Sequence, residues 1–234
     1  MISDKRVTST VGLTTEEVKK ICRGAAPKDR EKQLLCVVGE ELEQGFDFIK
    51  QYPKMVTILG SARTKEGDLF YEKARELGAR IVRELDMAVT TGGGPGIMEA
   101  ANRGAQEAGG VSLGIGIKLP NEQKFSPYVT ASMIFNFFFT RKVIMTYSAK
   151  AYVYFPGGYG TLDEFFEFIT LIQTKKIPPV PVFLYGSEYW EPLLDFIHNQ
   201  IEDHDYINKE DDHLFVITDN LDDIISGVTH FIEG

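Results

Sequence analysis

Residues 151–164 have the sequence AYVYFPGGYGTLDE, in which an apolar, β-prone run passes through a glycine turn into the start of a helix. The same order occurs twice upstream, where residues 55–59 lead into Gly60 and residues 87–91 lead into three successive glycines. Strands that alternate with helices form parallel sheets. The chain is therefore predicted to be an α/β protein with a Rossmann-like, doubly wound, mainly parallel sheet and helices on both faces.

The alternation of strands and helices continues from residue 55 to the C-terminus. The strands are uniformly apolar, which is typical of a sheet covered on both faces. We expect strands over residues 55–59, 87–91, 111–117, 133–139, 151–155, 180–184 and 214–217. We expect helices over residues 68–85, 95–108, 141–148, 161–173, 188–202 and 221–232.

The first 52 residues are predicted to be a helical extension. Thr14 to Glu17 form a T-x-x-E capping box that opens a short helix. A second helix is expected over residues 29–50, and Tyr52-Pro53 ends it. The predicted boundary therefore separates a helical extension at residues 1–52 from a Rossmann-like domain at residues 53–234.

Composition argues against several classes of partner. The 234 residues have a net charge of −9 and no Lys/Arg-rich run, which disfavours a nucleic-acid-binding surface. No apolar stretch is long enough to span a bilayer, so we expect no membrane partner. The N-terminus lacks the apolar region of a signal peptide. The two cysteines, Cys22 and Cys36, have no metal-ligand spacing, and a reduced, cytoplasmic compartment is the simplest interpretation. A small anion remains a suitable ligand, because a local pocket can be positive in an acidic protein.

All three glycine turns are expected at carboxyl ends of strands, where doubly wound sheets bind their ligands. Glycine lets the backbone approach a ligand closely, and free N–H groups at a helix start favour an anion. In the third turn, residues 157–161, three glycines precede a threonine that is expected to cap the next helix. No lysine follows the last glycine, so the turn is not the phosphate loop of ATPases.

The other two turns are less specific. Residues 92–99 lack the G-x-G-x-x-G spacing, because Ile97 and Glu99 stand where the last glycine would fall, so they predict no NAD site. This turn is either an anion site or a tight turn without a ligand. In the first turn, Ser61 and Arg63 either reach a phosphate or ribose oxygen, or lie on the surface in solvent.

Three charged residues have two interpretations each. Thr161-x-x-Glu164 is a capping box, in which Glu164 only bonds the amide of Thr161. Alternatively, the Glu164 carboxylate faces a ligand on the glycine turn, where it can orient water and stabilise a cationic transition state. Arg141-Lys142 likewise faces either solvent or that ligand, and spacing does not decide between the two.

Together, GGGPGIME at residues 92–99, Arg141-Lys142, and PGGYGTLDE at residues 156–164 resemble the LOG (Lonely Guy) family, whose motifs are GGGxxGxM and PGGxGTxxE. The resemblance covers about residues 55–198. It implies a nucleotide-binding catalytic domain that cleaves the N-glycosidic bond of a nucleoside 5'-monophosphate, such as AMP or a cytokinin riboside 5'-monophosphate. The products would be a free base and ribose 5-phosphate. The resemblance also implies a homodimer or a larger homo-oligomer.

The resemblance also assigns expected roles by position. Arg141 and Glu164 match the catalytic pair, with Glu164 stabilising the positive charge that develops on the ribose. The base is expected against apolar residues near Met98 and Met133. The chain has no histidine before Arg141, where the family often has one, which leaves the preferred base open. Substrate and phosphate contacts are implied for Gly157, Gly158, Gly160, Thr161, Lys142, Ser61, Arg63, Gly93, Gly94 and Met98.

No metal and no cofactor are expected. The histidines at 198, 204, 213 and 230 and the two cysteines have no metal-ligand spacing. The family also has an older label, lysine decarboxylase, but the sequence does not identify the Schiff-base lysine that pyridoxal phosphate chemistry needs. The alternative to a hydrolase is a non-catalytic protein of the same fold, either a molybdenum cofactor carrier or a nucleotide sensor.

Overall fold

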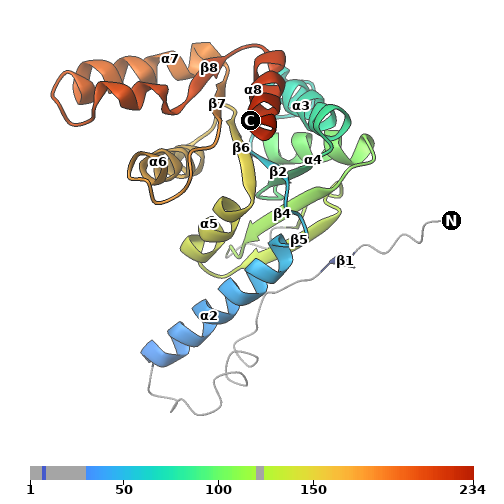
Figure 1. The fold of residues 1–234 in the computed structure, drawn as a ribbon. Helices are drawn as coiled ribbons and strands as arrows, with labels where there is room; N and C mark the ends of the chain where they lie inside the picture. Colours follow the sequence, from blue (N-terminus) through green and yellow to red (C-terminus); the bar gives the residue numbers. More distant parts are fainter. Residues whose placement is uncertain (1–6, 9–29, 120–123) are drawn as a thin grey trace.

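The computed structural model describes residues 7–8, 30–119 and 124–234. Within these ranges eight strands form one sheet in the order β1-β5-β4-β3-β2-β6-β7-β8, and every neighbouring pair is parallel (Figure 1). The predicted Rossmann-like fold is therefore confirmed. The strands are β1 (Val7–Thr8), β2 (Met55–Leu59), β3 (Ala88–Thr91), β4 (Ser112–Ile117), β5 (Ala131–Phe135), β6 (Ala149–Tyr154), β7 (Val182–Tyr185) and β8 (Val216–Thr218).

Helices cover both faces of this sheet (Figure 1). One face carries α3, α4 and α8, and the other carries α2, α5 and α6, with α7 beside β7 and β8. The helices are α2 (Arg30–Ile49), α3 (Leu69–Leu85), α4 (Ile97–Glu107), α5 (Phe138–Tyr147), α6 (Tyr159–Gln173), α7 (Ser187–Phe196) and α8 (Leu221–Glu233). A π-helical segment, Ile197–Glu202, continues α7, and a 3-10 segment, Lys209–Leu214, precedes β8. The short helix expected at Thr14 lies outside the described residues.

The strands are apolar on both sides because each side faces a core. On β2, Val56 and Ile58 point into the core under α3, α4 and α8, whereas Met55 and Leu59 point into the core under α2, α5 and α6. All four side chains are buried. Burying a side chain of this size contributes about 1.5–3 kcal/mol, so an alternating polar pattern would have weakened one of the two cores.

The chain changes direction in the sheet between β2 and β6. From β2 it adds β3, β4 and β5 on one side, and then returns to add β6, β7 and β8 on the other. β2 and β6 are neighbours, with Ile58 opposite Val153. In such sheets ligands bind outside the carboxyl ends of the strands at the point of reversal. This topology places the first and third glycine turns side by side at that point.

The run Met133–Phe139 is not a single strand, contrary to the prediction. β5 ends at Phe135 and α5 begins at Phe138. Phe138 and Phe139 are 55% and 52% exposed, so the second half of the run is a helix start rather than a buried strand. A continuous apolar run has no clear period, and hydrophobicity alone does not separate strand from helix. The consequence is that Arg141 lies near the N-terminus of α5.

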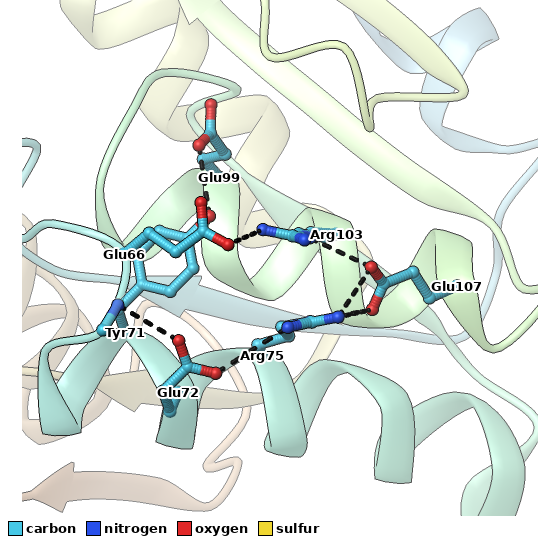
Figure 2. Close-up of polar contacts among 8 residues, drawn as sticks. Glu66, Tyr71, Glu72, Arg75, Glu99, Arg103 and Glu107 are labelled. Atoms are coloured by element: carbon cyan, nitrogen blue, oxygen red, sulfur yellow. Dashed lines mark hydrogen bonds and ion pairs between the residues drawn. The ribbon is translucent and has the colours of Figure 1, made fainter.

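Charged side chains connect α3, α4 and the loop that follows the first glycine turn (Figure 2). Arg103 on α4 forms ion pairs with Glu66 in that loop, at 2.6 Å, and with Glu107, at 3.0 Å. Arg75 on α3 reaches the same Glu107 at 2.7 Å. Exposed pairs contribute little individually, but this network fixes the loop beside α4 and thereby supports the first turn.

α2 packs on the main sheet through one side of the helix. Ile49 and Val37 are buried, and the helix contacts α5 and β5. Neither α2 nor any other helix in the described ranges is long and apolar enough to cross a membrane. The domain boundary at residue 52 stays a prediction.

Candidate active site

The three glycine turns meet at the point of reversal and are joined by their backbones. The amide of Ser61 in the first turn donates to the carbonyl of Pro156 in the third, at 3.0 Å. The carbonyl of Ser61 accepts from the amide of Ile97 at the end of the second, also at 3.0 Å. The first turn therefore lies between the other two and holds them at a fixed separation.

The third turn presents an open backbone at the start of a long helix. α6 begins at Tyr159 and its N-cap is Gly158, so Thr161 lies in the first turn of the helix and is not the predicted cap. Gly158 and Gly160 are exposed, and a methyl group on either would meet nothing within 4 Å. The first N–H groups of an α-helix lack intrahelical partners and favour an anion. This turn is accordingly a suitable place for a phosphate group.

Two neighbouring glycines provide a test of this arrangement. A methyl group on Gly157 would overlap with Thr161 Oγ1, so Gly157→Ala is expected to lower the free energy of unfolding by about 1–3 kcal/mol. Gly158→Ala should leave stability unchanged but weaken nucleotide binding, because its methyl group enters the open space above the turn. Thermal unfolding with and without AMP measures both effects. Unchanged nucleotide affinity in Gly158→Ala would place the phosphate elsewhere.

Arg141 and Glu164 form a buried ion pair beside the third turn. Arg141 Nη1 lies 2.7 Å from Glu164 Oε1, and Arg141 Nε donates to the carbonyl of Ile115 at 2.8 Å. The two residues are 7% and 5% exposed. Glu164 Oε1 therefore bonds Arg141 of α5 rather than the amide of Thr161, and the capping alternative does not describe its geometry. Arg141 is likewise not a solvated surface residue.

The second carboxylate oxygen of Glu164 is buried and has no hydrogen-bond partner among the residues that the structure describes. Leaving such an oxygen without a partner costs free energy, and unpaired buried polar groups often mark functional sites. Burial raises the pKa of Glu164 above its ordinary value of 4.5, and the charges of Arg141 and Lys142 offset this only in part. Within the described residues, the site thus holds one buried carboxylate oxygen that makes no hydrogen bond.

Lys142 points to α6 and not to the glycine turn. Its ammonium group lies 2.7 Å from Asp163 and also pairs with Glu167. Burial lowers the pKa of Lys142, but the bonds to these two carboxylates outweigh burial and the pKa is raised. Lys142 therefore connects α5 to α6 through two carboxylates that precede and follow Glu164 in the sequence. The sequence had instead predicted that Lys142 contacts the substrate.

The second turn borders the site, but the amide of Gly93 is already bonded within the turn. The amide of Gly93 donates to Thr91 Oγ1 at 2.8 Å, so it is not a free donor for an anion. Gly93 has a φ of 71°, which favours glycine, and the ring of Phe125 covers it. A methyl group on Gly92 would lie 3.0 Å from Arg141 Nη2 and 2.8 Å from Met98 Sδ. The turn therefore borders the arginine.

The remaining predicted contacts differ in accessibility. Ser61 Oγ accepts a hydrogen bond from the amide of Arg63, and the Arg63 side chain is exposed near the turns. Gly94 is buried. Met98 is half-buried beside Gly92, and Met133 is 1% exposed in the core under α5. The expected base contacts at Met98 and Met133 stay predictions.

Several residues that shape the site gave no local sequence signal. Asn102 of α4 is fully buried and accepts a hydrogen bond from Thr91, which holds the second turn. Tyr189 of α7 donates to the carbonyl of Gly157 at 2.6 Å, which holds the third. Phe125 fills the space above Gly114 and Gly116 of β4. The alternating glycines of β4 were the available signal for a large side chain packed on that strand.

The fold and the site define an α/β protein with an anion-binding glycine turn and a buried arginine–glutamate pair at the reversal point of a parallel sheet. Residues 98–228, more than half of the chain, match the model of the family described as possible lysine decarboxylase. The chain belongs to this family, which is that of the LOG proteins.

Curated relatives share moderate sequence identity. The chain is 28% identical over 152 residues to a cytokinin riboside 5'-monophosphate phosphoribohydrolase of Rhodococcoides fascians, covering 63% of this chain and 75% of that protein. It is 26% identical over 181 residues to the enzyme of that name, LOG5, of Arabidopsis thaliana, covering 76% and 78%.

Solved structures with the same fold include binding proteins. A molybdenum cofactor binding protein from Rippkaea orientalis has a TM-score of 0.56 at 21% identity, covering 77% of this chain and 98% of that one. The molybdenum cofactor carrier protein of Chlamydomonas reinhardtii has a TM-score of 0.55 at 23% identity, covering 78% and 99%. At these identities the likeness is one of fold alone.

The family's description as a possible lysine decarboxylase does not fit Lys142, the lysine beside the site. A Schiff-base lysine needs a neutral amine and therefore a lowered pKa. The pKa of Lys142 is raised by its bonds to Asp163 and Glu167, which keep the ammonium charged. The residues present at this site do not suit pyridoxal phosphate chemistry at Lys142.

Proposed function

We propose that this protein hydrolyses the N-glycosidic bond of a nucleoside 5'-monophosphate and releases the free base and ribose 5-phosphate. The observation that carries the proposal is the buried Arg141–Glu164 pair beside an open glycine turn, in which Glu164 Oε2 has no partner in the part of the chain that the structure describes. A binding turn alone would suit any phosphate ligand. A desolvated carboxylate with a free oxygen adds the group that glycosidic cleavage needs.

In this proposal each part of the site has one task. The backbone of residues 158–161 binds the 5'-phosphate at the N-terminus of α6. As the bond between the base and C1' lengthens, positive charge develops on the ribose, and the ionised Glu164 stabilises it. Glu164 Oε2 orients the water whose oxygen bonds to C1'. The attacking water releases one proton to solvent as its oxygen bonds to C1', and the departing base nitrogen takes up one proton from solvent, so the net change is the addition of one water. Arg141 holds Glu164 and the sugar in place.

The curated relatives support a hydrolase. The alternative, a carrier or a nucleotide sensor, is suggested by solved structures of the same fold. The curated relatives are phosphoribohydrolases that act on cytokinin riboside 5'-monophosphates. A carrier or a nucleotide sensor would need the phosphate-binding turn, but not a carboxylate with a free oxygen beside it. AMP and cytokinin riboside 5'-monophosphates are the proposed substrates, and a homodimer or larger homo-oligomer in the cytoplasm is the proposed form of the protein.

Product analysis tests the proposal directly. The purified protein is incubated with AMP, the other nucleoside monophosphates and N6-isopentenyladenosine 5'-monophosphate, and the free base and ribose 5-phosphate are measured by chromatography. Equal amounts of the two products are expected. Tight nucleotide binding without base release would instead support a carrier or a sensor.

The pH dependence of kcat/KM follows from the environment of Glu164. The ionised carboxylate is the active form, and burial raises its pKa in the folded protein above 4.5. Activity should therefore fall as the pH decreases through a midpoint above 4.5, because kcat/KM reports the ionisation of the free enzyme. Asp163→Asn, one residue away and exposed, should leave the midpoint in place. A midpoint at or below 4.5 would mean that another group controls the acid limb.

A further inference from the structure

A carboxylate from α2 is buried at the start of α5. Glu41 is 0% exposed. Its Oε1 accepts hydrogen bonds from the backbone amide of Asn136, at 2.5 Å, and from Asn136 Nδ2, at 2.6 Å. Its Oε2 accepts from Thr140 Oγ1 at 2.6 Å. Both oxygens of the carboxylate are thus used, and both contact the junction between β5 and α5.

The local sequence of α5 lacks what Glu41 supplies. The N-cap of α5 is Phe137, which makes no side-chain capping bond, and no acidic residue lies in the first turn. A helix N-terminus has a partial positive charge and unpaired N–H groups, which a negative group stabilises. Phe138 and Phe139 cannot fill this role. Glu41 provides a negative group from another helix, through its bonds to the amide of Asn136, one residue before the N-cap, and to the hydroxyl of Thr140.

Arg141 directly follows Thr140, so Glu41 holds the part of α5 from which Arg141 extends. The amide of Arg141 bonds the carbonyl of Phe137 at 3.3 Å within this first turn. The guanidinium group then has to reach both Ile115 and Glu164 at hydrogen-bond distances. A shift or fraying of this turn would move the guanidinium group away from both.

We propose that Glu41 is a positioning residue for Arg141, so that α2 takes part in the active site through the first turn of α5. The inference rests on the proposed function for its effect on turnover, and on the geometry alone for its effect on the Arg141–Glu164 pair. It gives the N-terminal extension a definite task. In this proposal, Glu41 on α2 sets the geometry of the ion pair between Arg141 on α5 and Glu164 on α6.

Matched substitutions on α2 test the effect on turnover. Glu41→Leu should lower kcat by about tenfold to a hundredfold, because a displacement of about 1 Å can cost that much. KM should change little, because the phosphate-binding turn is untouched. Glu41→Gln should retain most of the turnover, since its amide can accept from Asn136 and donate to Thr140. Glu43→Leu, an exposed glutamate on the same helix, should match the wild type.

A purely structural role would give a different result. It would lower the melting temperature of Glu41→Leu while the folded fraction kept its full kcat at low temperature, and that outcome would overturn the proposal. If Glu41→Leu does not fold, Thr140→Val is measured, because it keeps the shape of the side chain and removes the hydroxyl that bonds Glu41 and lies 2.9 Å from the carbonyl of Phe137. A smaller loss of kcat is expected there, and full turnover in folded Thr140→Val would also overturn the proposal.

A second readout does not depend on catalysis. The pKa of the Glu164 carboxyl is measured by NMR of 13C-labelled glutamate, with Glu164→Gln used for assignment. Glu41→Leu and Glu41→Gln both remove the charge of Glu41, so a higher pKa of Glu164 in the leucine variant alone reports displacement of Arg141. Equal values in both variants would refute the positioning role. If the wild type releases no base, the hydrolase proposal fails, and this comparison still decides the role of Glu41.

Discussion

Glu164→Gln is expected to abolish base release while the protein remains folded. Glutamine keeps the shape of the side chain, and its oxygen can still accept from Arg141 Nη1, where Glu164 Oε1 now lies at 2.7 Å. It loses the negative charge that stabilises the ribose cation and the second oxygen that orients water. The expected loss of kcat is about 10²- to 10⁴-fold, measured by release of free base.

Asp163→Asn is the matched control for this experiment. Asp163 is the preceding residue on α6 and its side chain is 62% exposed. Lys142 keeps its bond to Glu167 in that variant. Asp163→Asn should therefore retain most of the activity. Wild-type turnover in folded Glu164→Gln would show that Glu164 has only a structural role.

Arg141→Ala is expected to remove activity and to lower stability as well. Glu164 would be left buried without its cationic partner, and breaking a buried pair in this way costs about 3–5 kcal/mol. The loss of Arg141 removes an influence that lowers the pKa of Glu164. Glu164 should then bind a proton at higher pH, so the variant should gain stability relative to the wild type as the pH is lowered.

Thermal unfolding of Arg141→Ala across a range of pH, together with base release, measures both effects. Arg141→Lys is a useful companion, because it restores a positive charge without the fork that reaches Ile115 and Glu164 together. It should recover part of the stability and little of the activity. Normal kinetics in Arg141→Ala would remove this residue from the site.

The glycine turns were predictable from sequence because their signals are local. A strand, a bare backbone and a helix start occupy about a dozen neighbouring residues, as in residues 151–164. Parallel topology then brings the carboxyl ends of the strands to one edge, and this places the first and third turns beside each other. The third turn was predicted from this information alone.

The residues after Met133 show where local information is insufficient. Six of the seven residues from 133 to 139 are apolar, and hydrophobicity favours a strand throughout. At the division between β5 and α5, Glu41 bonds Asn136 and Thr140 from a position more than ninety residues earlier. No pattern within the run indicates that partner.

The two interpretations of Glu164 also needed tertiary structure. The T-x-x-E spacing is the same whether the carboxylate bonds its own helix or another one. Arg141 decides the matter, because it reaches Glu164 from α5. The interpretation of Lys142 also depended on tertiary structure. Lys142 is adjacent to Arg141 on α5, and its side chain points to Asp163 and Glu167 and away from the turn.

The hydrogen bonds that join the three turns run between main-chain atoms of Ser61, Pro156 and Ile97. Mutation cannot delete a main-chain carbonyl, so substitutions can accumulate around these turns over evolutionary time without separating them. Glycine is favoured where φ is positive, as at Gly93, and where a side chain lies close to the backbone, as Thr161 does at Gly157. Side chains around the turns, and with them the preferred ligand, can therefore change while the backbone arrangement of the turns is kept. Chains at 21% and 23% identity share this fold.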